Sequence, residues 1–179
     1  MVDLNSFSEE EKSLLVKLPF QVGFNISEAD GDGGEENERL EMEALFRILN
    51  LLPGVYHHVP LIQQILGETR DGHENWDAWK DGSFDVTKEC TNAISLLKEK
   101  ASDAEAKAFR KALLEVADTV ARAAGEGGML EIRMEPDSAF LQSVKKIMTA
   151  VGMIKKDDSA NISAAEEVAI DKISQALQV

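Results

Sequence analysis

Apolar residues recur at intervals of three and four along most of the chain, and this period limits the fold more than any other feature. No stretch alternates between apolar and polar residues over enough positions to form a sheet. The pattern therefore predicts an all-α protein, a compact bundle of six or seven helices with short connections. The clearest stripe of the first half consists of Leu14, Leu15, Leu18, Val22 and Ile26, followed by Met42, Leu45, Ile48, Leu49 and Leu52.

Capping signals locate the first expected helices. Ser8 and Glu11 form a capping box that opens a helix over about residues 8–28, and Pro19 inside it predicts a kink or break. A second helix is expected from Glu35, where acidic residues suit the helix dipole, to the Pro53-Gly54 pair.

Short elements are expected next. Residues 60–66 are a short helix candidate that opens on Pro60, and residues 67–83 are expected to form a polar, glycine-containing connection. Trp76 and Trp79 in this connection are interpreted as anchors that pin it to the core. The later helices are expected from Asp85 or Thr87 through Lys100, from the Ser102 and Glu105 capping box to about Ala124, from Pro136 to about Met153, and after Ser163 and Glu166.

The two halves of the chain resemble one another. A shift of 94 residues lays Gly31–Gly34 on Gly125–Gly128, with the preceding helices in step, and a one-residue slip aligns the helices that follow. We interpret this as an internal helix-loop-helix repeat over about residues 8–52 and 102–153, within one domain spanning residues 1–179. The alternative is two unrelated helix pairs that each end at glycines.

The charge and cysteine content exclude some classes of function. The formal net charge is −14, which repels nucleic acid phosphates and anionic lipid surfaces, and leaves a protein as the expected partner. Cys90 is the only cysteine, so neither an intramolecular disulfide nor a thiolate metal cluster can form. Residues 1–7 lack a secretory signal and no segment has the roughly twenty apolar residues of a membrane span, so a cytoplasmic location is expected.

The connection after the first helix is the candidate site. Asp30 and Asp32 alternate with glycines there, and glutamates follow at once. Two carboxylates 4 Å apart repel each other by about 4 kcal/mol at an effective dielectric constant near 20, and a hard cation such as Ca²⁺ or Mg²⁺ relieves that repulsion. The alternative is a solvated loop, whose glutamates only complement the positive end of the next helix.

An EF-hand is not expected at this connection. Asp30 and Asp32 have the spacing of its first two ligands, and Glu41 falls on the twelfth position. However, Glu35 stands where the sharp turn needs glycine, and Asn37 stands where a buried apolar residue is usual.

The stretch Ile26-Ser27-Glu28-Ala29-Asp30-Gly31, with the glutamate-rich helix after it, resembles the tellurite-resistance TerB family. The resemblance covers about residues 10–52 and more weakly 105–150. It implies a helical bundle without known enzymatic activity that binds divalent cations in stress responses and works with membrane-associated partners. It nominates Asp30 first as a metal ligand, and then Glu36 or Glu38. The additional glycines and the segment 53–83 depart from the family pattern.

Other candidate chemistry is sparse. His57 and His58 are adjacent, so their side chains point apart, and Asp71, His73, Asn75 and Asp77 alternate along a polar stretch. No nucleophile elbow, His-Glu-x-x-His or phosphate-binding glycine loop occurs, which disfavours an enzyme. Three hypotheses remain, in order: a cation-binding accessory protein, a protein-interaction module without metal, and a small-molecule hydrolase or binding protein with a pocket lined by His57, His58 and the tryptophans.

Overall fold

The structure is a computed structural model that describes residues 2–29, 31, 34–80, 84–123 and 162–178. The described residues form seven α-helices and two 3-10 helices, which confirms the all-α fold class. The elements are η1 Leu4–Ser6, α1 Glu9–Ser27, α2 Gly34–Val55, α3 Pro60–Asp71, η2 His73–Asn75, α4 Trp76–Lys80, α5 Val86–Lys100, α6 Asp103–Ala121 and α8 Ala164–Ala176.

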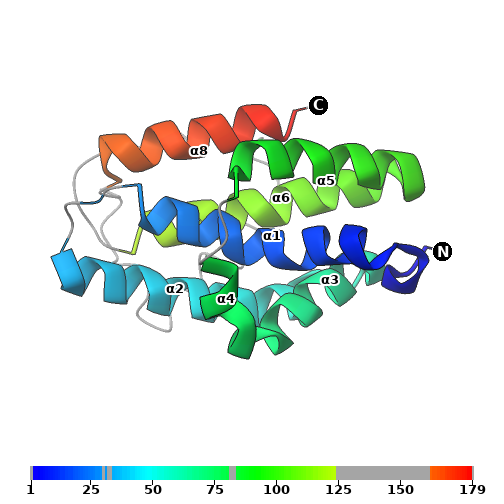
Figure 1. Cartoon of the computed structure of the whole chain (residues 1–179), viewed down its shortest axis with the longest axis horizontal. Coiled ribbons are helices and arrows are strands. Elements are labelled where there is room, and N and C mark those ends of the chain that lie inside the picture. Colours follow the sequence, from blue (N-terminus) through cyan, green and yellow to red (C-terminus); the bar gives the residue numbers. More distant parts are fainter. Residues whose placement is uncertain (1, 30, 32–33, 81–83, 124–161, 179) are drawn as a thin grey trace.

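Helices α1 and α6 pack against each other along the centre of the bundle (Figure 1). Helices α2 and α3 lie on one side of this pair, and α5 and α8 lie on the other. The short helix α4 packs across α1. Because α1 and α6 touch nearly every other described element, their buried faces determine where the core lies.

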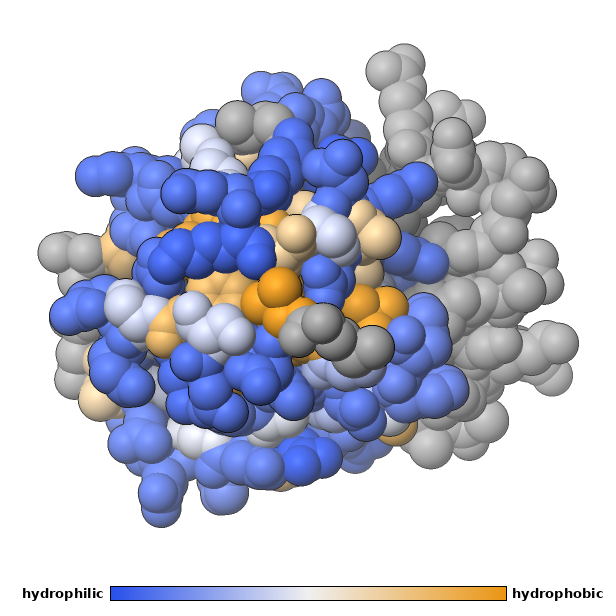
Figure 2. All heavy atoms as spheres, turned by 90° about the vertical axis from the view of Figure 1, so that its right-hand side faces the viewer, coloured by the Kyte–Doolittle hydropathy of each residue, from blue (hydrophilic) through white to orange (hydrophobic). Residues whose placement is uncertain are grey.

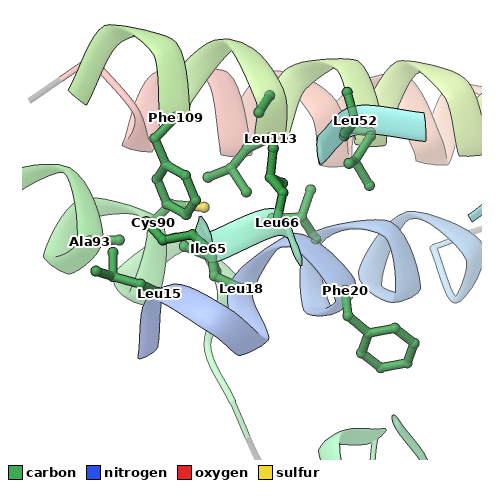
Figure 3. Close-up of a cluster of buried hydrophobic side chains, with 14 of the residues drawn as sticks. Leu15, Leu18, Phe20, Leu52, Ile65, Leu66, Cys90, Ala93, Phe109 and Leu113 are labelled. Atoms are coloured by element: carbon green, nitrogen blue, oxygen red, sulfur yellow. The ribbon is translucent and has the colours of Figure 1, made fainter. Parts of the chain in front are cut away.

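The core is one continuous cluster of buried apolar side chains (Figure 3). Leu15, Leu18, Ile65, Cys90 and Phe109 come from four different helices and are all fully buried in it. Burying each large apolar side chain stabilises the fold by roughly 1.5–3 kcal/mol. The apolar stripes read from the sequence are therefore the faces that meet in the core.

Helix α1 begins with the predicted capping box. The Ser8 hydroxyl accepts from the backbone N–H of Glu11, and the Glu11 carboxylate accepts from the backbone N–H of Ser8. The helix continues through Pro19 to Ser27. One turn before the proline, the carbonyl of Val16 lies 2.7 Å from the buried hydroxyl of Thr69 on α3, which donates to it.

Helix α2 extends past the proline that was expected to end it. It runs to Val55, with Pro53 inside its last turn. Proline removes only the donor that would reach the carbonyl four residues earlier, and the backbone N–H of Tyr56 still donates to the carbonyl of Leu52 at 2.9 Å. The helix therefore ends at Val55, one residue after the Pro53-Gly54 pair that was predicted to end it.

The segment 67–83 is more helical than predicted. Helix α3 continues to Asp71, and η2 and α4 follow it. Trp76 is 8% exposed, and its indole N–H donates to the carbonyl of Thr69 at 3.2 Å. The interpretation of the tryptophans as anchors agrees with this packing, because Trp79 is also packed on the core.

The later described helices begin as their caps predict. Asp85, rather than Thr87, caps α5, since its carboxylate accepts from two backbone N–H groups. Ser102 caps α6 by accepting from the backbone N–H of Glu105 at 3.2 Å. Ser163 and Glu166 open α8 with a complete capping box. Helix α6 ends at Ala121, three residues before the predicted end.

Part of the proposed repeat can be compared in three dimensions. Helices α1 and α6 both contain 19 residues, and their N-caps Ser8 and Ser102 are separated by the same 94 residues as the glycine segments. The second glycine segment, 125–128, and the helix expected over 136–153 lie outside the described residues. The repeat as a whole therefore stays a prediction.

The surface is largely hydrophilic at the end of the bundle that carries the N-terminus (Figure 2). A small apolar area lies near the middle of this face. No helix among the described residues is both long enough and apolar enough to cross a bilayer.

Candidate functional site

The predicted cation site lies at the connection between α1 and α2. Gly31 and Gly34 both have positive φ, at 44° and 75°, and a Cβ at either would meet no other atom within 4 Å. Asp30 and Asp32 lie outside the described residues, and so does the side chain of Glu36. Of the four predicted ligands, the structure therefore places only the side chain of Glu38, which is exposed on the first turns of α2.

The residues after Gly34 are helical, which excludes an EF-hand loop. A loop of that type would need residues 30–41 to wrap around the ion, but α2 already begins at Gly34. Glu41, at the twelfth position, is a buried residue of α2. Any cation bound here would therefore be held by the short connection and the first turn of α2.

Within the described ranges, no group of three His, Cys, Asp or Glu side chains is close enough to hold a metal ion. The two aspartates of the 71–77 stretch are already paired with neighbouring cations. Asp71 accepts from the guanidinium of Arg70 at 2.8 Å, which lowers the pKa of the Asp71 carboxyl. Asp77 pairs with Lys80 at 3.1 Å. These contacts favour a solvated segment over a metal site.

Five aromatic side chains gather where α4 covers α1 and α2, and we refer to them as the aromatic cluster. Phe20 stacks on Trp76 at a centroid distance of 4.8 Å, and Trp76 also meets Phe46 edge to face at 5.9 Å. Phe24 stacks on Phe20 at 6.0 Å, and Trp79 meets Phe20 at 5.9 Å. In Figure 3 the ring of Phe20 points away from the other labelled core side chains.

Phe46 is the exposed member of the aromatic cluster. It is 49% exposed, whereas Phe20 is fully buried and Trp76 nearly so. Lys80 sits over the ring of Phe24, a member of the cluster, at 5.8 Å. Arg47, next to Phe46 in the chain, pairs with Glu43, which Arg39 also contacts at 3.6 Å. An exposed aromatic ring beside cations is a surface type that protein interfaces favour.

A buried pair of ionisable groups connects α2 to α6. Tyr56 follows the last residue of α2, and its hydroxyl donates to Oε2 of Glu115 on α6 at 2.9 Å. Glu115 is 3% exposed, and its other oxygen, Oε1, is buried without a hydrogen-bond partner. A carboxylate normally accepts several hydrogen bonds, so the charged form of Glu115 is poorly compensated.

The surroundings of Glu115 shift its titration. Burial raises the pKa of its carboxyl to about 7, against the opposing effects of the Tyr56 hydrogen bond and the positive charge of Lys111, and Asp118 raises it further. Burial next to Glu115 also raises the pKa of the Tyr56 hydroxyl, so the tyrosine stays protonated. Near neutral pH the pair therefore exchanges between a neutral and a singly charged form.

His57 and His58 lie beside this pair and are exposed. Nδ1 of His57 is 2.9 Å from the carbonyl of Gly54, and the ring of His58 stacks on Tyr56 at 6.2 Å. The ring contacts of the two tryptophans are instead with Phe20, Phe46 and His73. In the described contacts, His57 and His58 therefore lie with Tyr56 and not with the tryptophans. The small-molecule pocket hypothesis requires these histidines and the tryptophans to line one pocket.

The sequence interpretation missed Tyr56 and Glu115. Tyr56 follows a proline and glycine that were expected to end a helix, so it was assigned to a connection. Glu115 does carry a signal, because it lies next to Val116 and three residues after Ala112, on the edge of the apolar face of α6. A glutamate at the edge of an apolar face is compatible with either burial or exposure.

The described residues define the class of the protein as an all-α helical bundle. Comparisons with protein-family models, with curated proteins and with solved structures found no match.

Proposed function

We propose that the protein is a non-enzymatic accessory protein whose acidic α1–α2 connection binds Ca²⁺ or Mg²⁺. The observation that supports this is the backbone at Gly31 and Gly34, which adopts positive φ on both sides of Asp32. Glycine adopts this conformation without strain, so a short connection can turn its carbonyl groups and carboxylates toward one ion. The resemblance to the TerB family implies the same function, and membership of that family stays a prediction.

The charges around the connection also support a cation. Glu35 and Glu38 are exposed at the start of α2, directly after the two aspartates of the connection. A divalent cation would reduce their mutual repulsion. The competing explanation is that these glutamates only complement the positive end of the α2 dipole and remain solvated.

Thermal unfolding distinguishes the two explanations. A ligand that binds only the folded state adds about 2.7 kcal/mol to the free energy of unfolding at a hundredfold excess over its Kd. We expect Ca²⁺ or Mg²⁺ to raise the melting temperature saturably relative to EDTA. Asp30→Asn with Asp32→Asn should abolish this rise.

A control variant should remove two negative charges elsewhere. Glu99 and Asp171 are exposed, on α5 and α8, so Glu99→Gln with Asp171→Asn should keep the cation response. A flat response of the unchanged protein, or an equal loss in both double variants, would contradict the cation proposal.

A second candidate function is a protein-interaction module, and exposed Phe46 favours it. The ring is held in place by its contact with Trp76 and is still 49% exposed. A rigid aromatic side chain loses little conformational entropy when a partner covers it. The partner would be a protein, soluble or membrane-associated, that presents an apolar side chain beside an acidic group able to pair with Lys80 or Arg47.

Site-specific photocrosslinking in cells tests the second candidate. A photoreactive phenylalanine at position 46 should crosslink a defined partner, and Lys80→Glu should weaken that crosslink by reversing a nearby charge. Val168 on α8 is 52% exposed and provides a matched control position. The same crosslinked species at both positions would show non-specific apolar contact and would contradict an interface at Phe46.

A further inference from the structure

We propose that Tyr56 and Glu115 form a proton-controlled latch that holds the α2–α3 turn, residues 56–59, against α6. The latch is closed when Glu115 is neutral, and it opens more often when Glu115 carries a negative charge. The observation behind it is the 2.9 Å hydrogen bond between two side chains that are both buried and come from different helical layers. It concerns a different part of the molecule from the proposed cation site.

The burial of the second oxygen explains why charge opens the latch, although the Tyr56 bond itself favours the charged form of Glu115. Oε2 of Glu115 accepts from Tyr56, but Oε1 is buried without a hydrogen-bond partner. Ionisation places a full negative charge on a group that the fold solvates on one side only. Moving the turn away from α6 would let water reach Oε1, so the open arrangement binds the charged form better.

The groups that face Glu115 from the described elements are few. Lys111 and Asp118 lie one turn before and one turn after it on α6, and Asp118 pairs with Arg122 at 2.7 Å. From the α2–α3 turn come Tyr56 and, stacked on its ring, His58.

The other described helices that pack against α6 present mainly apolar side chains to it. The buried polar side chains of α1 and α3 are Gln21, Ser27 and Thr69, which do not ionise. Helix α2, which also packs on α6, carries the buried and ionisable Glu41, but Glu41 is not among the groups that shift the pKa of Glu115. Glu166 in the first turn of α8 is engaged by its own capping box. The proton on Glu115 is therefore controlled mainly by burial, by Tyr56 and by the two charges of α6.

Besides the Glu115 bond, the turn is held by backbone bonds and by apolar packing, since Tyr56 is buried in the core and Val59 packs on it. Its backbone bonds run from Tyr56 N–H to the Leu52 carbonyl and from Val59 N–H to the Tyr56 carbonyl, each 2.9 Å. Helix α3 begins after Val59 without a side-chain cap, so the start of α3 adds no polar anchor. Both histidines of the turn are exposed. Local opening at this turn therefore gives up the Tyr56 bond, these backbone bonds and the core packing of the Tyr56 ring.

Amide hydrogen exchange, corrected for its intrinsic pH dependence, measures the opening directly. The amides of Tyr56 and Val59 are the probes, and the amide of Ala106, bonded to Ser102 at the start of α6, is the internal control. With the pKa of Glu115 near 7 in the closed form and 4.5 in the open form, we expect protection of the probes to fall roughly twentyfold from about pH 5.5 to about pH 7.5. Ala106 lies in the first turn of α6, where exchange proceeds by fraying of the helix end, so its protection should stay constant although global stability falls.

Three variants and one direct titration test the proposal. Glu115→Gln keeps an acceptor for Tyr56 and cannot ionise, so its probe amides should show no pH-dependent fall, whereas Glu99→Gln should behave as the unchanged protein. Tyr56→Phe should move the fall to higher pH. A pH-independent protection in the unchanged protein, or an equal fall in Glu115→Gln, would overturn the latch. If Glu115→Gln does not fold, carbon-13 NMR of the unchanged protein tests the latch instead. A Glu115 carboxyl that titrates near 4.5 would also overturn the proposal.

Discussion

The hydroxyl of Tyr56 donates to the carboxylate of Glu115 at 2.9 Å, although 59 residues separate them in the chain. Both groups are buried, and one oxygen of the glutamate has no partner. A fold stabilised mainly by apolar contacts thus contains one polar contact whose strength depends on a proton.

Global stability should depend on pH through Glu115. Its pKa is raised from 4.5 to about 7 in the folded protein, so the folded state holds a proton that the unfolded state has lost. Its contribution is fully present below about pH 4.5 and is lost as pH rises to about 7, a change of about 3 kcal/mol. The free energy of unfolding in urea, measured for the unchanged protein and for Glu115→Gln at each pH, isolates this fall as the difference between the two. A difference that is constant across the range would contradict the prediction.

Tyr56→Phe should destabilise the protein most at alkaline pH. The Tyr56 hydrogen bond lowers the pKa of Glu115, so its removal raises that pKa further and leaves the charged form without its donor. We expect a loss of about 2 kcal/mol above pH 7 and a smaller loss near pH 5. Urea unfolding at both pH values measures it. The same loss at both would mean that the contribution of the Tyr56 hydroxyl does not depend on the charge of Glu115, which would contradict the prediction.

Gly23→Ala and Gly67→Ala should change stability in opposite directions. A Cβ at Gly23 would lie 2.3 Å from Leu45 and 3.0 Å from Val116, in the fully buried contact of α1 with α2 and α6. A Cβ at Gly67 in α3 would meet nothing within 4 Å. We expect Gly67→Ala to stabilise the protein by up to about 1 kcal/mol, because alanine has the higher helix propensity. Gly23→Ala should destabilise the protein by about 1 kcal/mol net, because the clash outweighs the same gain in helix propensity. Thermal unfolding of both variants checks the sign, and equal shifts would contradict the packing at Gly23.

Thr69→Val should destabilise the bundle by about 1–2 kcal/mol. The Thr69 hydroxyl donates to the carbonyl of Val16 on α1, and the Thr69 carbonyl accepts from the indole of Trp76. Valine keeps the shape but not the donor. Thr91→Val is the matched control, because its hydroxyl is only partly buried and its two bonds are longer, at 3.2 Å. Urea unfolding should show the larger loss for Thr69→Val, and the reverse order would contradict the prediction.

Cys90 should be unreactive in the folded protein. It is fully buried on α5, and burial raises the pKa of its thiol to about 12, so almost no thiolate forms at neutral pH. A thiol reagent should modify the native protein slowly and modify one thiol per chain in denaturant. Rapid modification under native conditions would show that the core opens at α5.

The sequence predicted those features of the fold that depend on local signals. The capping serines Ser8 and Ser163 and the apolar period give helix positions directly, because each signal acts within one or two turns. Helix α4 was missed, since five residues cannot form a stable helix alone. It depends on the packing of Trp76 and Trp79 against distant Phe20, which no local pattern contains.

The candidate sites also differ in whether they depend on local signals or on tertiary contacts. The acidic connection around Asp32 is a local feature and was found as a motif. The pair Tyr56 and Glu115 exists only because α2 and α6 meet, and a glutamate on the edge of an apolar face gives no indication of its partner. Tyr56 does lie in the expected connection, directly after α2, but its burial against α6 depends on a tertiary contact that no local pattern contains.

Both tryptophans of the chain belong to the five-residue helix α4, and both pack on Phe20. Intrinsic fluorescence excited at long wavelength therefore reports on one small region of the molecule. A change in emission would record the detachment of α4 from α1, and circular dichroism at 222 nm would record the loss of the remaining helices. Two unfolding curves that do not superimpose would reveal that this region separates before the bundle does.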